Sequence, residues 1–340
     1  MAETTIASPD EAALTTQVPH KPDVLPTTPI KDTLLDDINK EIAEAKEEFS
    51  ELIALVNERY DGPDSILAGK PEQLQTFKAH NEQILSFAVE VGMRKGLKGK
   101  ELKMAEVAAI LHDLAKADKA PEGAADIKNY ILAAHGEIAA NEAEGILEER
   151  PQILEKILGE GYGDEQKKEA IDRIQTAIRS HMGPHPGFMT GILEGVNREL
   201  VKKGMPPIEH PYPDKNDNIS ETVLAADMAS LASTEGRKKV VSIIFNDLYF
   251  RDLAEKDAKL AQSKGIKLEA SDIAVMNGFK SAEEARDMIR DPNDREWMDG
   301  LIEKSKGETN MYGDREVKFT EDKWNEYGSF LKLKVQQKSG

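Results

Sequence analysis

Hydrophobic positions recur every three or four residues along most of the chain, which is the spacing of one face of an α-helix. Between residues 65 and 235 this spacing predicts a series of helices separated by loops rich in Gly, Pro and Asp. The predicted helices are Pro71 to Arg94, Gly99 to Ala117, Ile127 to Glu149, Gln166 to His181, Thr190 to Lys203 and Ser220 to Ser233. No convincing alternation typical of strands interrupts them, so the sequence predicts an all-α helical bundle.

The segments on either side differ in pattern. A 3–4 spacing from Leu34 to Val56 predicts a long amphipathic helix that ends near Gly62-Pro63 and either packs on the core or mediates homo-oligomer formation. The N-terminus, rich in Thr, Pro, Ala and Asp, is predicted to be a disordered tail. The C-terminal part is more polar and is predicted to hold helices near 240–260, 282–290 and 297–304, with an ambiguous segment at 317–324. The boundaries are 1–32 for the tail, 33–62 for the long helix, 63–236 for the central domain and 237–340 for a helical extension.

Composition narrows the classes of partner and chemistry. The 340 residues carry a net charge of −18, which disfavours a nucleic-acid duplex or an anionic membrane surface as partner. The chain has no cysteine, so thiolate chemistry and disulfides are excluded and any metal must be held by N and O ligands. No apolar run approaches the ~20 residues needed to cross a bilayer, and the first residues lack the features of a signal peptide. A cytoplasmic protein is expected.

Polar side chains interrupt apolar helices at several points. The small-residue apolar run from Val107 to Leu111 leads directly into His112-Asp113, and Asp227 lies inside the apolar segment Val223 to Leu231. Burying such groups costs several kcal/mol unless each finds a partner, and a metal ion suits an adjacent imidazole and carboxylate. The structural alternatives are a polar last turn for the His-Asp pair and a salt bridge to Lys or Arg for Asp227.

Three further histidines fit the same pattern. His80 lies at the edge of the apolar stripe of its helix, and His135 and His181 each follow an apolar face where small residues interrupt it. Taken singly, each could equally be a core histidine with an ordinary hydrogen bond. His185 follows His181 by four residues, but the Gly and Pro between them forbid a helix, so a loop position near the site is expected. His210, in the Pro-rich loop 204–219, is expected to be exposed to solvent.

Taken in order, His80, His112-Asp113, Lys116, His135, His181 and Asp227 resemble the HD-domain metal-dependent phosphohydrolase superfamily. The run Leu-His-Asp-Leu-Ala-Lys is similar to the HD-x-x-K form of the HD-GYP phosphodiesterases and their relatives. The resemblance covers about residues 70–235. Where HD-GYP proteins have Gly-Tyr-Pro, this chain has Met182-Gly-Pro-His-Pro-Gly, so specificity for cyclic di-GMP is not expected.

The resemblance implies two metal sites. The first would comprise His80, His112, Asp113 and Asp227, and the second Asp113, His135 and His181, with Asp113 bridging. Imidazole and carboxylate ligands suit two divalent ions drawn from Mn, Fe, Co, Ni and Zn. Lys116 is expected to act with Asp113 in catalysis and to bind the substrate phosphate, although an exposed lysine at a helix end is the structural alternative. Arg179 and His185 are further candidates for substrate binding.

The function predicted from these residues is hydrolysis of a phosphomonoester, phosphodiester or nucleotide phosphate by a metal-activated hydroxide. The expected partner is a small phosphorylated substrate. Two alternatives stay open. One is a di-iron oxygenase of the HD type, and the other is a non-catalytic helical regulatory module that holds a structural metal. Every one of these hypotheses requires six side chains, far apart in the sequence, to converge on one pocket.

Overall fold

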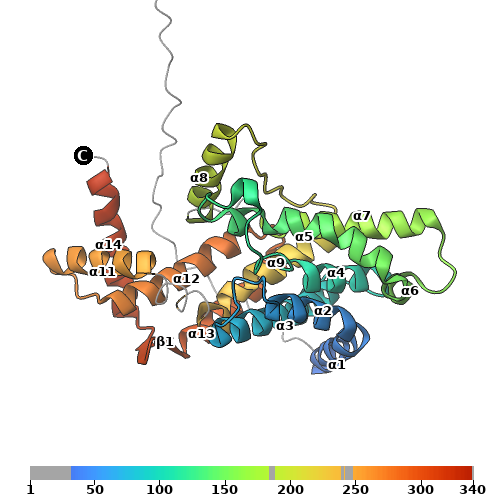
Figure 1. The fold of residues 1–340 in the computed structure, drawn as a ribbon. Coiled ribbons are helices and arrows are strands. Elements are labelled where there is room, and N and C mark those ends of the chain that lie inside the picture. Colours follow the sequence, from blue (N-terminus) through green and yellow to red (C-terminus); the bar gives the residue numbers. More distant parts are fainter. Residues whose placement is uncertain (1–31, 184–187, 239–240, 242–247, 339–340) are drawn as a thin grey trace, which may run out of the picture.

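The computed structural model describes residues 32–183, 188–238, 241 and 248–338 and is built almost wholly of α-helices (Figure 1). The predicted all-α class is confirmed. The elements, in order, are α1 (Asp32–Glu48), α2 (Ser50–Asp61), α3 (Pro71–Arg94), α4 (Lys100–Leu111), the 3-10 turn η1 (Glu122–Ala124), α5 (Tyr130–Glu149), α6 (Pro151–Leu158), α7 (Asp164–Ser180), α8 (Phe188–Lys202), α9 (Asn218–Ala232), α11 (Leu248–Ser263), α12 (Ala270–Met288), α13 (Pro292–Lys306), β1 (Thr309–Tyr312), β2 (Arg315–Lys318) and α14 (Glu321–Lys338).

Helix α9 lies at the centre of the molecule and packs against α3, α4 and α7 on one side and α12 and α13 on the other. Its sequence is apolar around almost the whole circumference, and nearly every residue in it is buried, as expected for a helix surrounded by other helices. Asp217 caps its first turn by accepting hydrogen bonds from the amides of Ile219 and Ser220. This central position brings Asp227 among the other helices that carry candidate ligands.

The N-terminal segment is kinked at Phe49 rather than forming one continuous helix. Phe49 leaves helical geometry (φ −103°, ψ 21°), while its ring is fully buried in the core. The backbone bonds from Phe49 N to Ala45 O and from Ile53 N to Phe49 O span the kink. Helix α2 ends at Asp61, next to the predicted stop at Gly62-Pro63. The segment packs on the core, through contacts of α1 with α3 and of α2 with α3 and α4.

The predicted helices of the central region are present, with small shifts at their ends. Helix α3 spans the predicted residues, whereas α4 ends at Leu111, before the expected Ala117. After Leu111 the backbone tightens into i→i+3 turns, with Leu114 N bonded to Leu111 O and Lys116 N to Asp113 O. Helix α6, which begins at Pro151 in the favourable first position, was missed by the sequence analysis.

The C-terminal part differs more from expectation. The predicted short helix at 282–290 is the end of the 19-residue α12. The ambiguous segment 317–324 divides between β2 and α14, and β1 and β2 form an antiparallel hairpin that was not predicted. Its two-residue turn begins at Gly313, whose positive φ of 59° suits a type II′ hairpin. A shared apolar core joins α9 to α12, α13 and α14, so this extension packs directly on the central helix.

Three predictions concern residues that lie wholly or partly outside the described ranges. They are the tail 1–32 except for its last residue, His185, and the start of the helix expected near 240–260, whose later part is α11. Within the described residues, no helix is both long and apolar enough to cross a membrane.

Candidate metal centre

Six predicted ligand residues come together from five separate elements. His80 lies on α3, His135 on α5 and Asp227 on α9. His112 and His181 each occupy the position that ends a helix, α4 and α7 respectively, and Asp113 follows in the turn after α4. The predicted convergence is therefore confirmed. Four of the six are fully buried, and the side chains of His80 and Asp227 are 5% and 12% exposed.

Asp113 lies at the middle of the cluster, and its two carboxylate oxygens face different histidines. Oδ2 is 3.2 Å from His80 Nε2 and 3.5 Å from His112 Nε2. Oδ1 is 3.1 Å from His135 Nε2 and 3.8 Å from His181 Nε2. Asp113 thus presents one carboxylate oxygen to each of two pairs of imidazoles.

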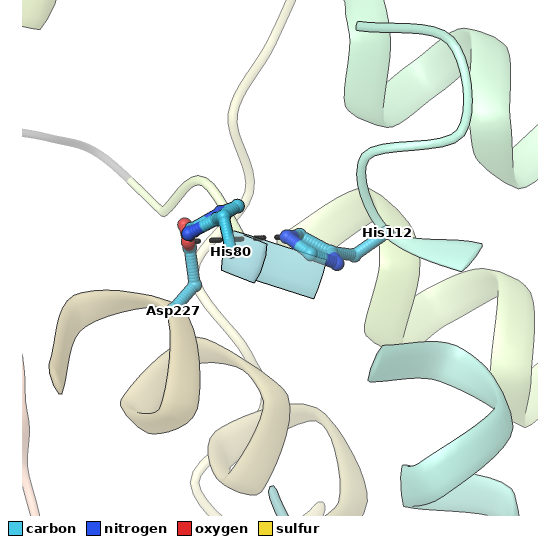
Figure 2. Close-up of side chains that lie close together, drawn as sticks. All are labelled: His80, His112 and Asp227. Atoms are coloured by element: carbon cyan, nitrogen blue, oxygen red, sulfur yellow. Dashed lines mark ion pairs between the residues drawn. The ribbon is translucent and has the colours of Figure 1, made fainter. Parts of the chain in front are cut away.

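Asp227 closes the cluster on the side of His80 and His112. Its Oδ1 is 3.6 Å from His80 Nε2 and 3.9 Å from His112 Nε2, as Figure 2 shows. The potential ligand atoms of His80, His112 and Asp227 lie within 4.8 Å of one another, and so do those of His112, Asp113 and His181. Among the described residues, this acid lies within ion-pair distance of imidazoles alone, and Lys116 acts on it only through its charge.

Local hydrogen bonds orient three of the imidazoles. Each Nδ1 lies close to a carbonyl three residues earlier: 2.7 Å for His112 and Ala109, 3.0 Å for His135 and Leu132, and 2.6 Å for His181 and Ile178. Because a carbonyl only accepts, Nδ1 carries the hydrogen in each bond, and a neutral ring then holds its lone pair on Nε2. These Nε2 atoms point at the carboxylates, which is the usual preparation of histidine for metal binding.

The polar atoms of the cluster fit a cation. His112 Nε2 and Asp113 Oδ1 are buried without a hydrogen-bond partner among the described residues, which is costly unless something else satisfies them. His135 Nε2 and His181 Nε2 lie only 3.2 Å apart. Burial, reinforced by His112 and His135, holds the pKa of His181 well below its usual range, so this ring is neutral at pH 7. A cation would occupy the space to which these lone pairs point.

The charges of the pocket favour cation binding as well. Burial alone would raise the pKa of Asp113, but the neighbouring His112 and Lys116 outweigh burial and hold that pKa well below its usual range. Burial is likewise outweighed at Asp227, where His112, His181 and Lys116 lower the pKa to about 2. Burial disfavours the ammonium of Lys116, yet Asp113 and Asp227 raise its pKa. With the imidazoles neutral, as metal binding requires, these two carboxylates outnumber the one ammonium of Lys116, which pairs with Asp113.

Helix α2 contacts the backbone of Asp113, the central residue of the cluster. The buried Tyr60 donates a hydrogen bond from its hydroxyl to the carbonyl of Asp113, at 2.9 Å. Burial raises the pKa of Tyr60 well above its usual range, so it remains a donor. Its neighbour Arg59 forms a two-pronged ion pair with Asp118 and also pairs with Glu142 of α5. The sequence analysis missed these residues, because nothing in the pattern of α2 distinguishes them from other positions of an amphipathic helix.

A glycine permits the close approach of α5 and α7. A methyl group built at Gly136 would lie 3.0 Å from Cε1 and 3.3 Å from Nδ1 of His181. The residue after His135 must therefore be small for the two imidazoles to meet. The sequence shows a glycine directly after His135, but only the position of His181 in the structure explains why this residue must be small.

The remaining candidate residues have different surroundings. Lys116 Nζ lies 2.6 Å from Asp113 Oδ2 and therefore belongs to the cluster, in contrast to the exposed lysine of the structural alternative. Arg179 is engaged outside it, donating to Glu137 at 2.6 Å and to Asn141 at 3.1 Å. The expectation for His210 was wrong: it is partly buried and donates from Nε2 to the carbonyl of Ala133 on α5, at 2.7 Å. His185 lies outside the described residues.

A cleft of about 760 Å³ includes His80 of the cluster in its lining. Its walls are one face of α3, the three residues Glu235, Gly236 and Lys238 after α9, and Met311, Gly313 and Asp314 of the β1–β2 hairpin. Among the six cluster residues, only His80 is part of this lining. The C-terminal extension thus contributes to the surroundings of the candidate metal centre.

Comparison with known proteins finds no match for this chain among family models, curated proteins or solved structures. The fold and the site describe an all-helical protein with a buried His–Asp cluster suited to metal ions.

Proposed function

We propose that this chain is a metal-dependent hydrolase of phosphate esters. The observation that carries the proposal is the placement of Asp113, whose two oxygens each face a different pair of histidines. One cation would be held by His80, His112, Asp113 and Asp227, and a second by Asp113, His135 and His181. This division is also what the resemblance to HD-domain phosphohydrolases implies, and it uses ligands that suit first-row divalent metals.

A pair of such ions, when bound, lowers the pKa of a water molecule and neutralises charge that develops on phosphoryl oxygens. The chain's own residues have complementary tasks. The carbonyl bonds to Nδ1 hold three imidazoles in the orientation that directs Nε2 at the ions. The Lys116 ammonium, held beside Asp113, supplies a point charge for a substrate phosphate. The complete burial of His112, His135 and His181 keeps bulk water from the ligand atoms.

The proposal is tested by metal analysis followed by assays of turnover. Protein stripped with a chelator and reloaded with Mn²⁺ or Co²⁺ should hydrolyse an aryl phosphate or members of a nucleotide panel. Asp113→Ala and His135→Ala should each reduce turnover at least about a hundredfold, because loss of a ligand costs more than loss of a supporting hydrogen bond. His210→Ala is the matched control, since this partly buried histidine contacts α5 outside the cluster and should leave turnover within about threefold.

Other results would point elsewhere. Metal bound in stoichiometric amounts without turnover of any phosphate ester would indicate a structural metal, and equal turnover by Asp113→Ala and the unaltered chain would remove Asp113 from the mechanism. Protein produced in iron-rich medium should also be examined by Mössbauer spectroscopy. A stable mixed-valent di-iron signal together with oxygen consumption would replace hydrolysis by oxidation.

A further inference from the structure

The cleft that reaches His80 has a polar wall supplied by one face of α3. Its members are spaced three and four residues apart, so they share one side of the helix: Glu72, Gln75, Thr76, Ala79, His80 and Gln83. The amide oxygen of Gln83 lies 3.1 Å from the Ser233 hydroxyl, which shares its one hydrogen with Ser230 O at 2.7 Å, and the amide nitrogen of Gln83 is a further donor. Thr76 donates to its own helix, at Glu72 O, and its hydroxyl oxygen still accepts. This wall suits a ligand that carries hydroxyl groups.

The opposite wall comes from the hairpin and from the residues after α9. Met311 lies in this wall with 39% of its surface exposed. A flexible thioether there can cover the apolar face of a small ligand. Gly313 and Asp314 form the turn beside it. The two walls together therefore offer hydrogen-bonding groups on one side and, on the other, the apolar side chain of Met311 among charged residues.

The charge of the cleft is opposite to what a phosphate chain requires. Three carboxylates, Glu72, Glu235 and Asp314, line it against the single ammonium of Lys238. That ammonium is 2.7 Å from Glu235, which already balances it. The positive charge that can attract a phosphoryl group is instead at the metal centre and at Lys116. A substrate with one phosphate at the metals would place its organic part in the cleft, whereas a second phosphate there would meet the remaining carboxylates.

We infer that the cleft between α3 and the β1–β2 hairpin binds the leaving group of the substrate, and that it selects monophosphate esters of a neutral, hydroxyl-bearing alcohol. The inference rests on the proposed function, which it makes more specific. The volume of about 760 Å³ falls within the range of sites for small molecules, about 300–1,000 Å³, and accommodates a sugar or a nucleoside. The C-terminal extension acts in this way as a determinant of specificity for the metal centre in the helical core.

The test measures binding by calorimetry to protein loaded with Mn²⁺, at constant free metal. Two matched pairs of probes differ only in a second phosphate: glucose 6-phosphate with glucose 1,6-bisphosphate, and adenosine 5′-monophosphate with adenosine 3′,5′-bisphosphate. Inorganic phosphate measures the metal end alone. In each pair the monophosphate should bind about tenfold more tightly than the bisphosphate. At least one monophosphate should bind more tightly than inorganic phosphate, because only an ester reaches the cleft.

A charge change in the hairpin turn shows whether the cleft causes this preference. Asp314→Lys should shift the ratio of bisphosphate to monophosphate affinity by about threefold to tenfold in favour of the bisphosphate. Glu296→Lys makes the same change at an exposed position of α13 outside the cleft, and should leave the ratio as it was. Circular dichroism of both variants verifies that the helices are intact.

The outcomes separate the two proposals. Inorganic phosphate binding as tightly as both monophosphates would overturn the inference, and so would equal ratios for Asp314→Lys and Glu296→Lys. Either result is compatible with hydrolysis of an aryl phosphate, in which case the proposed function stands without the specificity. Discrimination among the probes without any turnover would reverse the situation: the cleft would be a binding site, and the hydrolase proposal would fail.

Discussion

The side chain of His181 is confined from two directions, and this makes its environment a sensitive probe of the cluster. Its Nδ1 is hydrogen-bonded to Ile178 O at 2.6 Å. Its ring edge lies next to Gly136, at a distance that leaves no room for a side chain there. The ring cannot move away from α5 without breaking the carbonyl bond that orients it. Each of these contacts is local, yet together they set where Nε2 points.

Gly136→Ala is therefore expected to weaken metal binding by about tenfold or more, because the added methyl displaces the His181 ring. Stability should change little, since alanine favours the helix by roughly 0.5–1 kcal/mol and offsets part of the strain. Calorimetric titration with Mn²⁺ measures the first effect. Gly145→Ala on the same helix is the control: nothing lies within 4 Å of its added methyl, so it should raise stability and leave metal affinity unchanged.

Glu106 of α4 is a buried carboxyl outside the cluster, and one of its oxygens has no hydrogen-bond partner among the described residues. Burial, with Glu41 and Glu48 of α1 adding to it and Lys103 opposing it, raises the pKa of Glu106 from the ordinary 4.5 to about 8. A raised folded-state pKa contributes stability that is present in full below pH 4.5 and is lost as the pH rises toward 8.

Glu106→Gln should remove this dependence, because the amide never ionises. At pH 8 the variant is expected to be more stable than the original chain by roughly 3–5 kcal/mol, with the difference vanishing near pH 4.5. Urea unfolding at several pH values measures it. Glu144→Gln, at an exposed position of α5, should follow the original chain throughout. A difference that stays constant with pH would mean that Glu106 is already ionised in the folded protein.

At the scale of single residues, the sequence predicted the candidate metal ligands but not the residues that hold them in place. Asp227 and the His112-Asp113 pair stand out because each interrupts a run of apolar residues, and such an interruption needs a compensating partner. Tyr60 and His210 could not be found in this way. A tyrosine on an amphipathic helix and a histidine in a Pro-rich loop are ordinary residues until tertiary contacts bring them to Asp113 and Ala133.

Among the elements, α2 has a role that its pattern did not suggest. It was expected to pack on the core or to join two copies of the chain. It packs on the core. In addition, Tyr60 bonds to the Asp113 carbonyl and Arg59 pairs with Asp118, and both contacts hold the turn that follows α4. A helix that lies before the cluster in the sequence thus holds the backbone of its central carboxylate.

Tyr60→Phe tests this role, since it removes only the hydroxyl. The Asp113 carbonyl retains its bond from Lys116 N, so the loss of stability should be modest, about 0.5–1.5 kcal/mol. Metal affinity should fall more clearly, by about tenfold, because the turn that positions Asp113 is loosened. Thermal unfolding and Mn²⁺ titration measure the two quantities. Tyr162→Phe, a half-buried tyrosine away from the cluster, should not alter metal binding.

The helices themselves were predictable to the extent that their patterns are local. Helix α3, with Pro71 at its start, was predicted over its whole length, because a first-turn proline and an unbroken apolar stripe define it. The β1–β2 hairpin was missed, since its strands have four residues each and only Met311 opposite Glu316 and Asn310 opposite Val317 form its central pairs. So short a hairpin depends on packing against α12, which no local pattern reveals.

At the scale of the whole molecule, a cluster of buried charges joins the extension to the core. Lys95, at the end of α3, lies 2.8 Å from Asp294, 3.4 Å from Asp291 and 3.5 Å from Glu221. Its side chain is only 6% exposed. The three acids come from α9 and the first residues of α13, so one ammonium connects three helices.

Lys95→Met should destabilise the protein by about 3–5 kcal/mol, because it leaves the buried Asp294 carboxylate without its counter-ion. Lowering the pH should recover part of the loss. Burial already raises the pKa of Asp294, and without the ammonium this acid takes up a proton more readily. Urea unfolding at pH 7 and pH 5 measures both effects. Lys98→Met removes the same charge from an exposed position three residues away and should cost less than about 0.5 kcal/mol.

Both tryptophans of the chain, Trp297 and Trp324, belong to the extension. The indole of Trp297 donates to Glu90 of α3 at 2.9 Å and lies edge-on to Phe87, so it is at the contact between extension and core. Intrinsic fluorescence therefore monitors the extension and its seam, whereas circular dichroism monitors all the helices. A red shift of the emission at a lower urea concentration than the loss of ellipticity would mean that the extension, which holds both tryptophans, unfolds before the helical bundle.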